Sequence, residues 1–281
     1  MGHTNEHTGR ETVNDVDTAE GSIAIRLKDV HKDYGTQTVL EDVDLTIPRG
    51  KTTVVVGESG GGKSTLLKIM LGLVKPDRGQ VEILGRDLTR VSRRELKKVR
   101  MNFGVLFQNV ALFDSMTVYD NVALPLRERT DSDPDEVRER VEEKLALMDL
   151  DGTNDKFPAQ LSGGMRKRVG LARALVLDPK VVFFDEPTTG LDAHKSNEIY
   201  RLFYRTQAKL GYTAVIVSHD VPKIFKLSDF VALLADGTVQ GCMSPEEFQL
   251  AENPRIRKFV ETTMGTIYSS EKEEAGLYEK V

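Results

Sequence analysis

Hydrophobic and polar positions along the chain predict two kinds of β-strand. Apolar and polar side chains alternate in residues 22–35 (SIAIRLKDVHKDYG) and 38–47 (TVLEDVDLTI). This alternation is typical of strands in an antiparallel sheet that has one solvent-exposed face. Other runs are short and almost wholly apolar, as expected of buried parallel strands. These runs are TTVVVG (52–57), FGVLFQ (103–108), KVVFFDEP (180–187) and TAVIVSHD (213–220).

A helical pattern dominates the stretch from about 110 to 163, where strand signals are few. Asp133 stands at a predicted N-cap, with Pro134 at the first helical position. A single apolar stripe then recurs at helical spacing, formed by Val137, Val141, Leu145 and Met148. A separate basic helix is predicted to begin at a capping box of Ser92 and Glu95.

Alternating strands and helices predict an α/β fold with a mostly parallel sheet core, an antiparallel β layer and a helical subdomain at about 110–165. Asp236–Gly237, inside FVALLADGTVQGCM, predicts a tight hairpin. The expected regions are a disordered N-terminal tail (1–21), a main α/β domain (22–245), and a C-terminal helix and extension (246–281).

Composition narrows the classes of function. The 281 residues are 39% hydrophobic and 30% charged, with a net charge of −5, so no global basic field favours nucleic acid. No run approaches the roughly 18 apolar residues of a membrane span. The polar first 21 residues lack the apolar segment of a secretory signal. The single cysteine, Cys242, fits a reducing compartment, so a cytosolic chain without a nucleic-acid partner is expected.

A phosphate-binding loop is the first chemical signal. GESGGGKS, Gly57 to Ser64, matches G-x-x-x-x-G-K-[ST] and lies between an apolar strand and a predicted helix. The glycines let backbone N–H groups wrap a phosphate, Lys63 reaches the β- and γ-phosphates, and the Ser64 hydroxyl is a Mg²⁺ ligand. The alternative is a glycine-rich turn with an exposed lysine. The predicted nucleotide-binding residues here are Gly57, Glu58, Ser59, Gly60, Gly61, Gly62, Lys63, Ser64 and Thr65.

Polar side chains that follow the buried strands complete a hydrolytic site. We expect Asp185 to hold Mg²⁺ through its water shell and Glu186 to orient or deprotonate the attacking water. His219 is predicted to contact the γ-phosphate, and Gln108 to contact Mg²⁺ or that water, because parallel strands end at one ligand crevice. The alternatives are an ordinary acidic strand end and a structural histidine. A glutamate directly after the aspartate favours hydrolysis over a nucleotide kinase.

A second anion site is predicted at Leu161 to Arg168, LSGGMRKR, where a serine and two glycines precede a helix. The phosphate loop, Gln108, LSGG, FFDE, GLD and His219 stand in the order found in ABC-type ATPases. The chain resembles that family over roughly residues 23 to 245. The resemblance implies a P-loop NTPase fold, ATP with Mg²⁺, and a helical subdomain that grips a transmembrane partner.

The resemblance also assigns further residues. Tyr34 matches the aromatic that stacks on adenine, the alternative being a half-buried strand tyrosine. Asp192 in TTGLDAH matches the aspartate that links two ATP sites. Since the chain has one phosphate loop and one LSGG loop, two copies are expected to form an ATP-sandwich homodimer. One copy then binds ATP through its phosphate loop, and the other through Ser162, Gly163 and Gly164.

Features beyond the motifs that ABC-type ATPases share indicate which substance is transported. Most family members have glutamine after the second glycine, whereas Met165 followed by basic residues resembles the ATPases of Mla and Mce lipid transport systems. ENPRIRKFVETTMG predicts a helix after Pro254 with Ile256, Phe259 and Val260 on one face. With the tail after it, this helix resembles the extension by which MlaF-like ATPases reach the other ATPase subunit. The alternative is a frayed charged tail.

The resemblance implies an ATPase that powers phospholipid transport from the cytoplasmic face of the inner membrane, as a peripheral subunit. Its implied partners are integral-membrane permease subunits, MCE-type substrate-binding subunits and small regulatory subunits. Two other functions stay open. One is an ATPase of another ABC importer or of a lipoprotein-release system, and the other is a soluble ABC protein that works on DNA repair or ribosomes.

Overall fold

A computed structural model describes residues 22–219 and 224–264 of the chain. The predicted N-terminal tail, and the part of the C-terminal extension after residue 264, lie outside these described residues.

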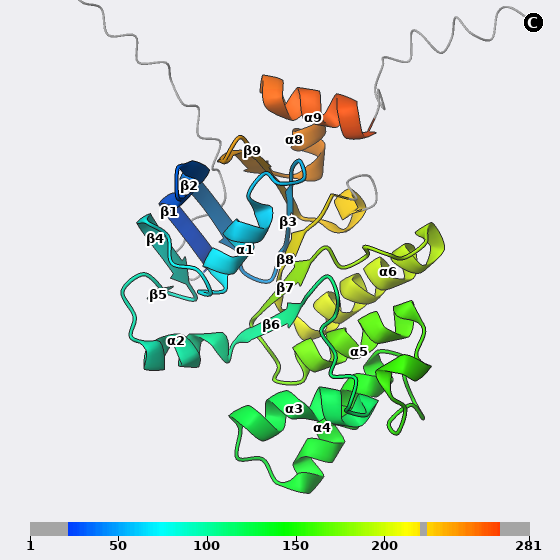
Figure 1. Ribbon diagram of the computed structural model, residues 1–281. Coiled ribbons are helices and arrows are strands. Elements are labelled where there is room, and N and C mark those ends of the chain that lie inside the picture. The colour runs from blue at the N-terminus through cyan, green and yellow to red at the C-terminus, as the bar shows by residue number, and fades with distance from the viewer. Residues whose placement is uncertain (1–21, 220–223, 265–281) are drawn as a thin grey trace, which may run out of the picture.

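A six-stranded sheet forms the centre of the described chain (Figure 1). In spatial order its strands are β10 (Thr238–Met243), β9 (Phe230–Ala235), β3 (Thr52–Val56), β8 (Thr213–Val217), β7 (Val181–Asp185) and β6 (Phe103–Leu106). All neighbours pair in parallel except β10, which forms the predicted hairpin with β9 around Asp236–Gly237. Every residue of β3 and β8 is buried, which confirms the buried parallel strands expected from their apolar runs.

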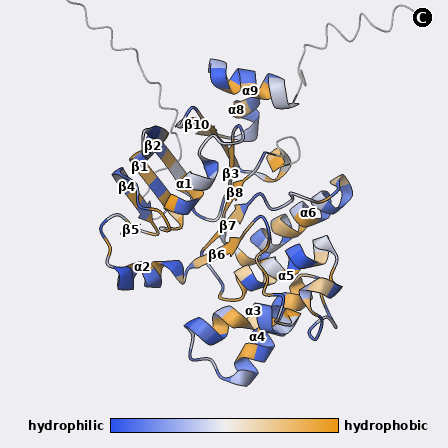
Figure 2. Cartoon of the chain, viewed as in Figure 1, coloured by the Kyte–Doolittle hydropathy of each residue, from blue (hydrophilic) through white to orange (hydrophobic). Residues whose placement is uncertain are grey.

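A second, antiparallel sheet covers one side of this core, as the alternating segments predicted. Its strands, in order, are β2 (Gln37–Pro48), β1 (Ile23–Tyr34), β4 (Arg78–Ile83) and β5 (Arg86–Asp87). Ile25 and Leu40 of this sheet share a core with Leu66 and Ile69 of α1 (Lys63–Met70) and with the larger sheet. Figure 2 shows the hydrophobic strands at the centre and hydrophilic α2 (Arg93–Arg100) at the surface.

Local sequence signals set where the helices begin. The Ser92 side chain accepts from the Glu95 N–H and the Glu95 carboxylate accepts from the Ser92 N–H, which confirms the predicted capping box. Asp133 caps its helix with Pro134 at the first position, also as predicted. The remaining helices are α3 (Val118–Arg129), α4 (Pro134–Leu147), α5 (Gly163–Leu175), α6 (Ala193–Leu210), α8 (Pro245–Leu250) and α9 (Pro254–Met264), with 3₁₀ turns at Pro158–Gln160 and Phe225–Leu227.

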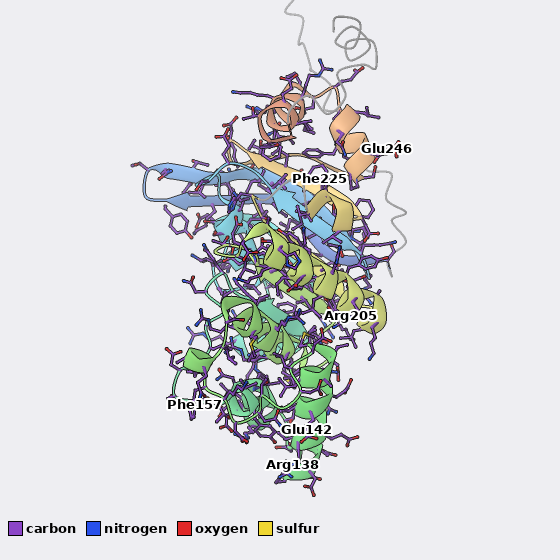
Figure 3. All side chains as sticks on the ribbon, turned by 90° about the vertical axis from the view of Figure 1, so that its right-hand side faces the viewer. Arg138, Glu142, Phe157, Arg205, Phe225 and Glu246 are labelled. Atoms are coloured by element: carbon purple, nitrogen blue, oxygen red, sulfur yellow. The ribbon has the colours of Figure 1, made fainter. Side chains whose placement is uncertain are left out.

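Helices α3 and α4 pack against α5 and form one end of the molecule. The predicted apolar stripe of α4 is buried in this packing, from Val137 at 4% exposed to Met148 at 0%. Figure 3 shows Arg138 and Glu142 on α4 at this end, and Phe225 and Glu246 near the opposite end. The interface with α5 therefore connects the helical end to the central sheet.

The predicted apolar face of α9 packs on the chain's own domain. Ile256 is fully buried, and Phe259 and Val260 are half-buried against the same core. The Phe259 ring contacts Phe248 of α8 at a centroid distance of 6.3 Å, and Phe248 in turn contacts Phe225 at 5.3 Å. The apolar face of α9 is therefore occupied within the chain.

Candidate functional site

The phosphate loop links the buried strand β3 to helix α1. Gly57 and Gly62 have φ of +154° and +94°. A Cβ on Gly62 would lie 2.9 Å from the Val39 carbonyl oxygen, and one on Gly57 would overlap the Leu234 carbonyl. Glycine is therefore required at both ends of the loop, because any side chain would force the loop away from the strands that hold it.

Lys63 begins α1 and is turned back into the loop. Its side chain is only 7% exposed, and Nζ donates to the carbonyl oxygens of Gly57 (2.9 Å) and Glu58 (2.8 Å). Burial lowers the pKa of this ammonium, and the carboxylates of Glu186 and Asp185 oppose the shift. The N-cap Gly62 has no side chain to cap the helix, so the N–H groups of the first turn are available to donate to an anion.

The two predicted acidic residues lie at the end of β7. Burial raises the pKa of Asp185, and the neighbouring Glu186 carboxylate raises it further. The charges of Lys68, Lys167 and Lys63 oppose this rise. Two adjacent carboxylates with only partial neutralisation make a site that favours a bound cation.

Glu186 and His219 are brought together although 33 positions separate them. His219 Nδ1 lies 2.7 Å from Glu186 Oε2, and the His219 backbone N–H donates to the same oxygen at 3.4 Å. The Glu186 side chain is 16% exposed and its backbone has φ of +46°, a strained conformation for a non-glycine residue. Strain of this kind is frequent where a side chain must point at a reacting group.

Gln108 follows β6 after Phe107, at the same edge of the sheet as Asp185 and His219. Its side chain is exposed, whereas its backbone carbonyl is hydrogen-bonded by a side chain of α5. Its carbonyl oxygen accepts from Lys167 Nζ of α5 at 2.5 Å. The side-chain oxygens of Ser64, Gln108 and Asp185 are hard ligands of the type that Mg²⁺ prefers.

Sequence reasoning missed two residues that hold the segment after β6. Besides Lys167, Arg173 of α5 donates to the carbonyl oxygens of Ala111 (2.7 Å) and Val110 (2.5 Å). From the sequence alone, the basic residues of LSGGMRKR indicate only the subfamily. The sequence does contain a signal that Lys167 is buried, because Lys167 falls at helical spacing in line with an apolar stripe of α5. This stripe, which is buried in the structure, comprises Gly170, Leu171, Ala174 and Leu175.

The LSGG segment lies at the start of α5, away from α1. Ser162 is the exposed N-cap and its hydroxyl accepts from the Met165 N–H at 3.2 Å. A Cβ on Gly164 would meet nothing within 4 Å, so the first turn is open to a ligand. Helix α5 packs on α3, α4, α6 and β6, whereas α1 packs on β2, β4, β7 and β8 (Figure 1). The two anion sites therefore belong to different parts of the chain.

The remaining predicted residues occupy exposed positions. Tyr34 ends β1 and is 49% exposed, with the Lys32 ammonium 5.3 Å from the centroid of its ring. Asp192 is the N-cap of α6 and pairs with Lys195 Nζ at 2.9 Å. Hydrogen bonds from the Lys195 backbone and side chain lower the pKa of Asp192 to about 2. The carboxylate is thus held as an anion at the helix start.

Comparison with known families decides the class of this site. The family model described as "ABC transporter" matches residues 40–189, more than half of the chain. The chain belongs to the ABC transporter family. It is therefore an ABC ATPase that binds and hydrolyses ATP for transport, which confirms the predicted fold and enzyme class.

Relatives of this ABC ATPase carry two kinds of name. It is 42% identical over 260 residues to the "probable ribonucleotide transport ATP-binding protein mkl" of Mycobacterium tuberculosis, covering 92% of this chain and 72% of that protein. It is 38% identical over 244 residues to the "intermembrane phospholipid transport system ATP-binding protein MlaF" of Escherichia coli K12, covering 86% and 91%.

Solved structures of ABC ATPases have the same fold. One is a dimer of the cassette MJ0796 in a post-hydrolysis state bound to ADP and Pi. It is 33% identical, has a TM-score of 0.71, and covers 79% of this chain and 98% of that one. Another is cbiO1 of Clostridium perfringens, with 31% identity, a TM-score of 0.77 and coverage of 92% and 99%. Among the described helices of the present ABC ATPase, none is long and apolar enough to cross a bilayer.

Proposed function

We propose that this ABC ATPase powers a membrane transporter of phospholipid and works as a head-to-tail pair of copies that share Mg²⁺ and ATP. The observation that carries the cargo is the match to MlaF, because it extends over 91% of that relative's length. Met165 and the basic residues after it support the same subfamily. The ribonucleotide named for the mycobacterial relative is the second candidate cargo.

The site residues divide the chemistry of hydrolysis among them. Lys63 and the N–H groups of the loop bind the β- and γ-phosphates, and Tyr34 stacks on the adenine. Ser64, Gln108 and Asp185 would hold Mg²⁺, which supplies charge neutralisation at the phosphate oxygens. Glu186 orients and deprotonates the attacking water, and its contact with His219 fixes the direction of the carboxylate.

The second copy supplies the other half of the phosphate site. The open first turn of α5 offers the Ser162 hydroxyl and the N–H groups of Gly163 and Gly164 to the γ-phosphate of the facing copy. Reversing a 1:99 population of closed and open pairs needs roughly 5.5 kcal/mol of differential binding. Several charge-assisted hydrogen bonds of about 1.5–3 kcal/mol each across two sites can supply it. Loss of the γ-phosphate after hydrolysis then reopens the pair.

A groove between the sheet and the helical end fits a helix of the permease. Its cavity is about 400 Å³, and Leu73 (57% exposed), Phe107 (39%) and Phe113 (50%) present apolar surface there. Arg100 and Arg129 also line it. Phe107 directly precedes Gln108, so an occupant of the groove adjoins the ATP site. We expect a cytoplasmic helix of the permease with an apolar face and acidic ends.

Changing Leu73 to aspartate should weaken binding of the permease by about 30-fold or more, since an apolar anchor of an interface is worth roughly 2 kcal/mol. Basal ATP hydrolysis should stay unchanged, because Leu73 contributes no group to the phosphate site. The measurement is co-purification with the permease and its stimulation of hydrolysis. Leu250→Asp, at another exposed leucine (67%) on α8, is the matched control. Equal binding by both variants would rule the groove out.

The cargo is tested on the complex isolated from its native membranes. We expect integral-membrane permease, MCE-type and small regulatory subunits to co-purify, with the ATPase on the cytoplasmic face of the inner membrane. Mass spectrometry should find bound phospholipid, and the reconstituted complex should move labelled phospholipid between vesicles only with ATP. Stimulation of hydrolysis by ribonucleotides but not by phospholipid would instead favour the second cargo.

A further inference from the structure

We propose that Lys167 is a positioning residue that connects the chain's own ATP site to the LSGG loop serving the other copy. The inference rests on the proposed function, because it assigns Gln108 to one copy's nucleotide and Ser162 to the facing copy's nucleotide. Lys167 lies on α5 five residues after Ser162, and its Nζ donates to the Gln108 carbonyl oxygen.

Lys167 is a lysine in the interior of the protein. The residue is 5% exposed, although lysine is seldom buried without partners. Its Nζ donates to the Gln108 carbonyl oxygen at 2.5 Å. Burial lowers the pKa of Lys167, and the Asp185 charge opposes that shift. The ammonium therefore donates to a backbone carbonyl after β6 and feels the negative charge of the carboxylate at the end of β7.

Nucleotide binding would make this second cation more important. Lys63 is the other buried lysine near Asp185; two of its three N–H donors bind the carbonyl oxygens of Gly57 and Glu58, and the third would be directed to phosphate. Lys167 approaches from α5, outside the phosphate loop, and keeps its place. It thus continues to hold the Gln108 backbone and to offset the acidic charge while Lys63 is engaged.

Helix α5 contacts the segment after β6 at three positions on one face. Lys167 holds the Gln108 carbonyl, and Arg173 holds the Val110 and Ala111 carbonyls. Between them, a Cβ on Gly170 would overlap Val110 and lie 2.8 Å from Leu106. Positions 167, 170 and 173 are three apart, so they share a helix face.

Because α5 contacts the segment after β6 so closely, the two should move together. Val110 and Ala111 both have positive φ (59° and 52°), so the segment has an unusual backbone shape that α5 matches. Ser162 caps the same helix five residues before Lys167, a rise of about 7.5 Å. A shift of α5 on closing of the pair must therefore displace Gln108, and a shift of Gln108 must displace Ser162.

The test compares Lys167→Met, which keeps length and loses charge, with Lys167→Arg, which keeps the charge. For Lys167→Met in the full-length chain, kcat should fall by about 10- to 100-fold, the usual effect of losing a residue that supports a metal site. The KM for ATP should change less than about threefold, because Lys63 and the loop still bind phosphate. Lys167→Arg should restore most of kcat. Lys209→Met makes the same substitution at an exposed lysine of α6 outside both anion sites; it is the matched control and should behave as the unaltered chain.

Two further readouts separate positioning from a general structural role. Hydrogen exchange at the Val110 and Ala111 amides, which donate to Phe107 and Asn109, should accelerate in Lys167→Met with little change in melting temperature. In a Glu186→Gln background, which retains ATP, the ATP concentration for half-maximal pairing should rise about fivefold or more.

The inference is overturned if Lys167→Met retains kcat, or if its kcat, magnesium-free ATP binding and melting temperature fall together. It is also overturned if kcat falls while exchange at Val110 and Ala111 is unaltered. Failure of the proposed function looks different, because Glu186→Gln would then hydrolyse ATP normally. An inactive Glu186→Gln beside a fully active Lys167→Met defeats this inference alone.

Discussion

Replacing Glu186 with glutamine should lower kcat for ATP hydrolysis by about 100- to 10,000-fold, the usual contribution of a positioned general base. The amide has nearly the shape of the carboxylate and can still accept from His219, so the geometry is preserved. Glu186 raises the pKa of Asp185, and its neutralisation therefore favours ionised Asp185. Binding of ATP with Mg²⁺ should consequently persist, and pairs of copies should accumulate because ATP is not consumed.

The measurement combines steady-state hydrolysis with equilibrium ATP binding. Glu142→Gln, at an exposed position of α4 in the helical end of the molecule (Figure 3), controls for a general effect of removing one acidic charge. If Glu186→Gln hydrolysed ATP at the normal rate, the base would have to be another group. If it lost ATP binding, Glu186 would be a structural residue and the assignment would fail.

Replacing Ser162 with aspartate should abolish ATP-driven pairing and lower hydrolysis by roughly 100-fold or more, while a single copy still binds ATP. Aspartate is as good an N-cap as serine, so α5 should keep its start. Its carboxylate, however, would face the γ-phosphate of the other copy, where two lost charge-assisted hydrogen bonds alone cost about 3–6 kcal/mol. The structure makes this test possible because Ser162 is exposed and its hydroxyl bonds within α5.

Sedimentation with and without ATP measures the pairing, and nucleotide titration of the dilute chain measures binding to one copy. Ser162→Thr keeps both the cap and the hydroxyl, so it should retain most activity. Lys63→Ala provides the contrast, since it should weaken binding to a single copy. A Ser162→Asp chain that binds ATP as poorly as Lys63→Ala would place the two loops on the same nucleotide and contradict the shared site.

The fold was predictable to the extent that local patterns determine it. The all-apolar runs became β3, β6, β7 and β8, because only strands covered on both faces can be apolar throughout. Caps such as Asp133 and Ser92 are contacts within four residues, so the sequence displays them directly. The positions of Gly57, Gln108, Asp185 and His219 were predictable for a related reason, since each ends or follows a parallel strand at one edge of the sheet. Their roles stay predictions.

The contacts of Lys167 and Arg173 were not predictable in this way. Each binds a carbonyl about sixty positions away, and a basic residue in a helix is usually solvated. The groove likewise joins residues from α2, β6, α3 and α5 that lie far apart in the chain. The assignments of Tyr34 and Asp192 stay predictions, as does the role of the extension beyond residue 264.

By itself, the sequence determined which strands are buried, and it predicted which loops bind phosphate and which carboxylates follow the buried strands. Each of these signals is carried by neighbouring residues in the chain. Only the tertiary structure decided that Glu186 meets His219, that the LSGG turn opens on a different part of the chain from Lys63, and that α5 grips the segment after β6. The physical reason is that burial of an ion and the direction of a backbone carbonyl depend on packing between distant segments, which periodicity does not encode.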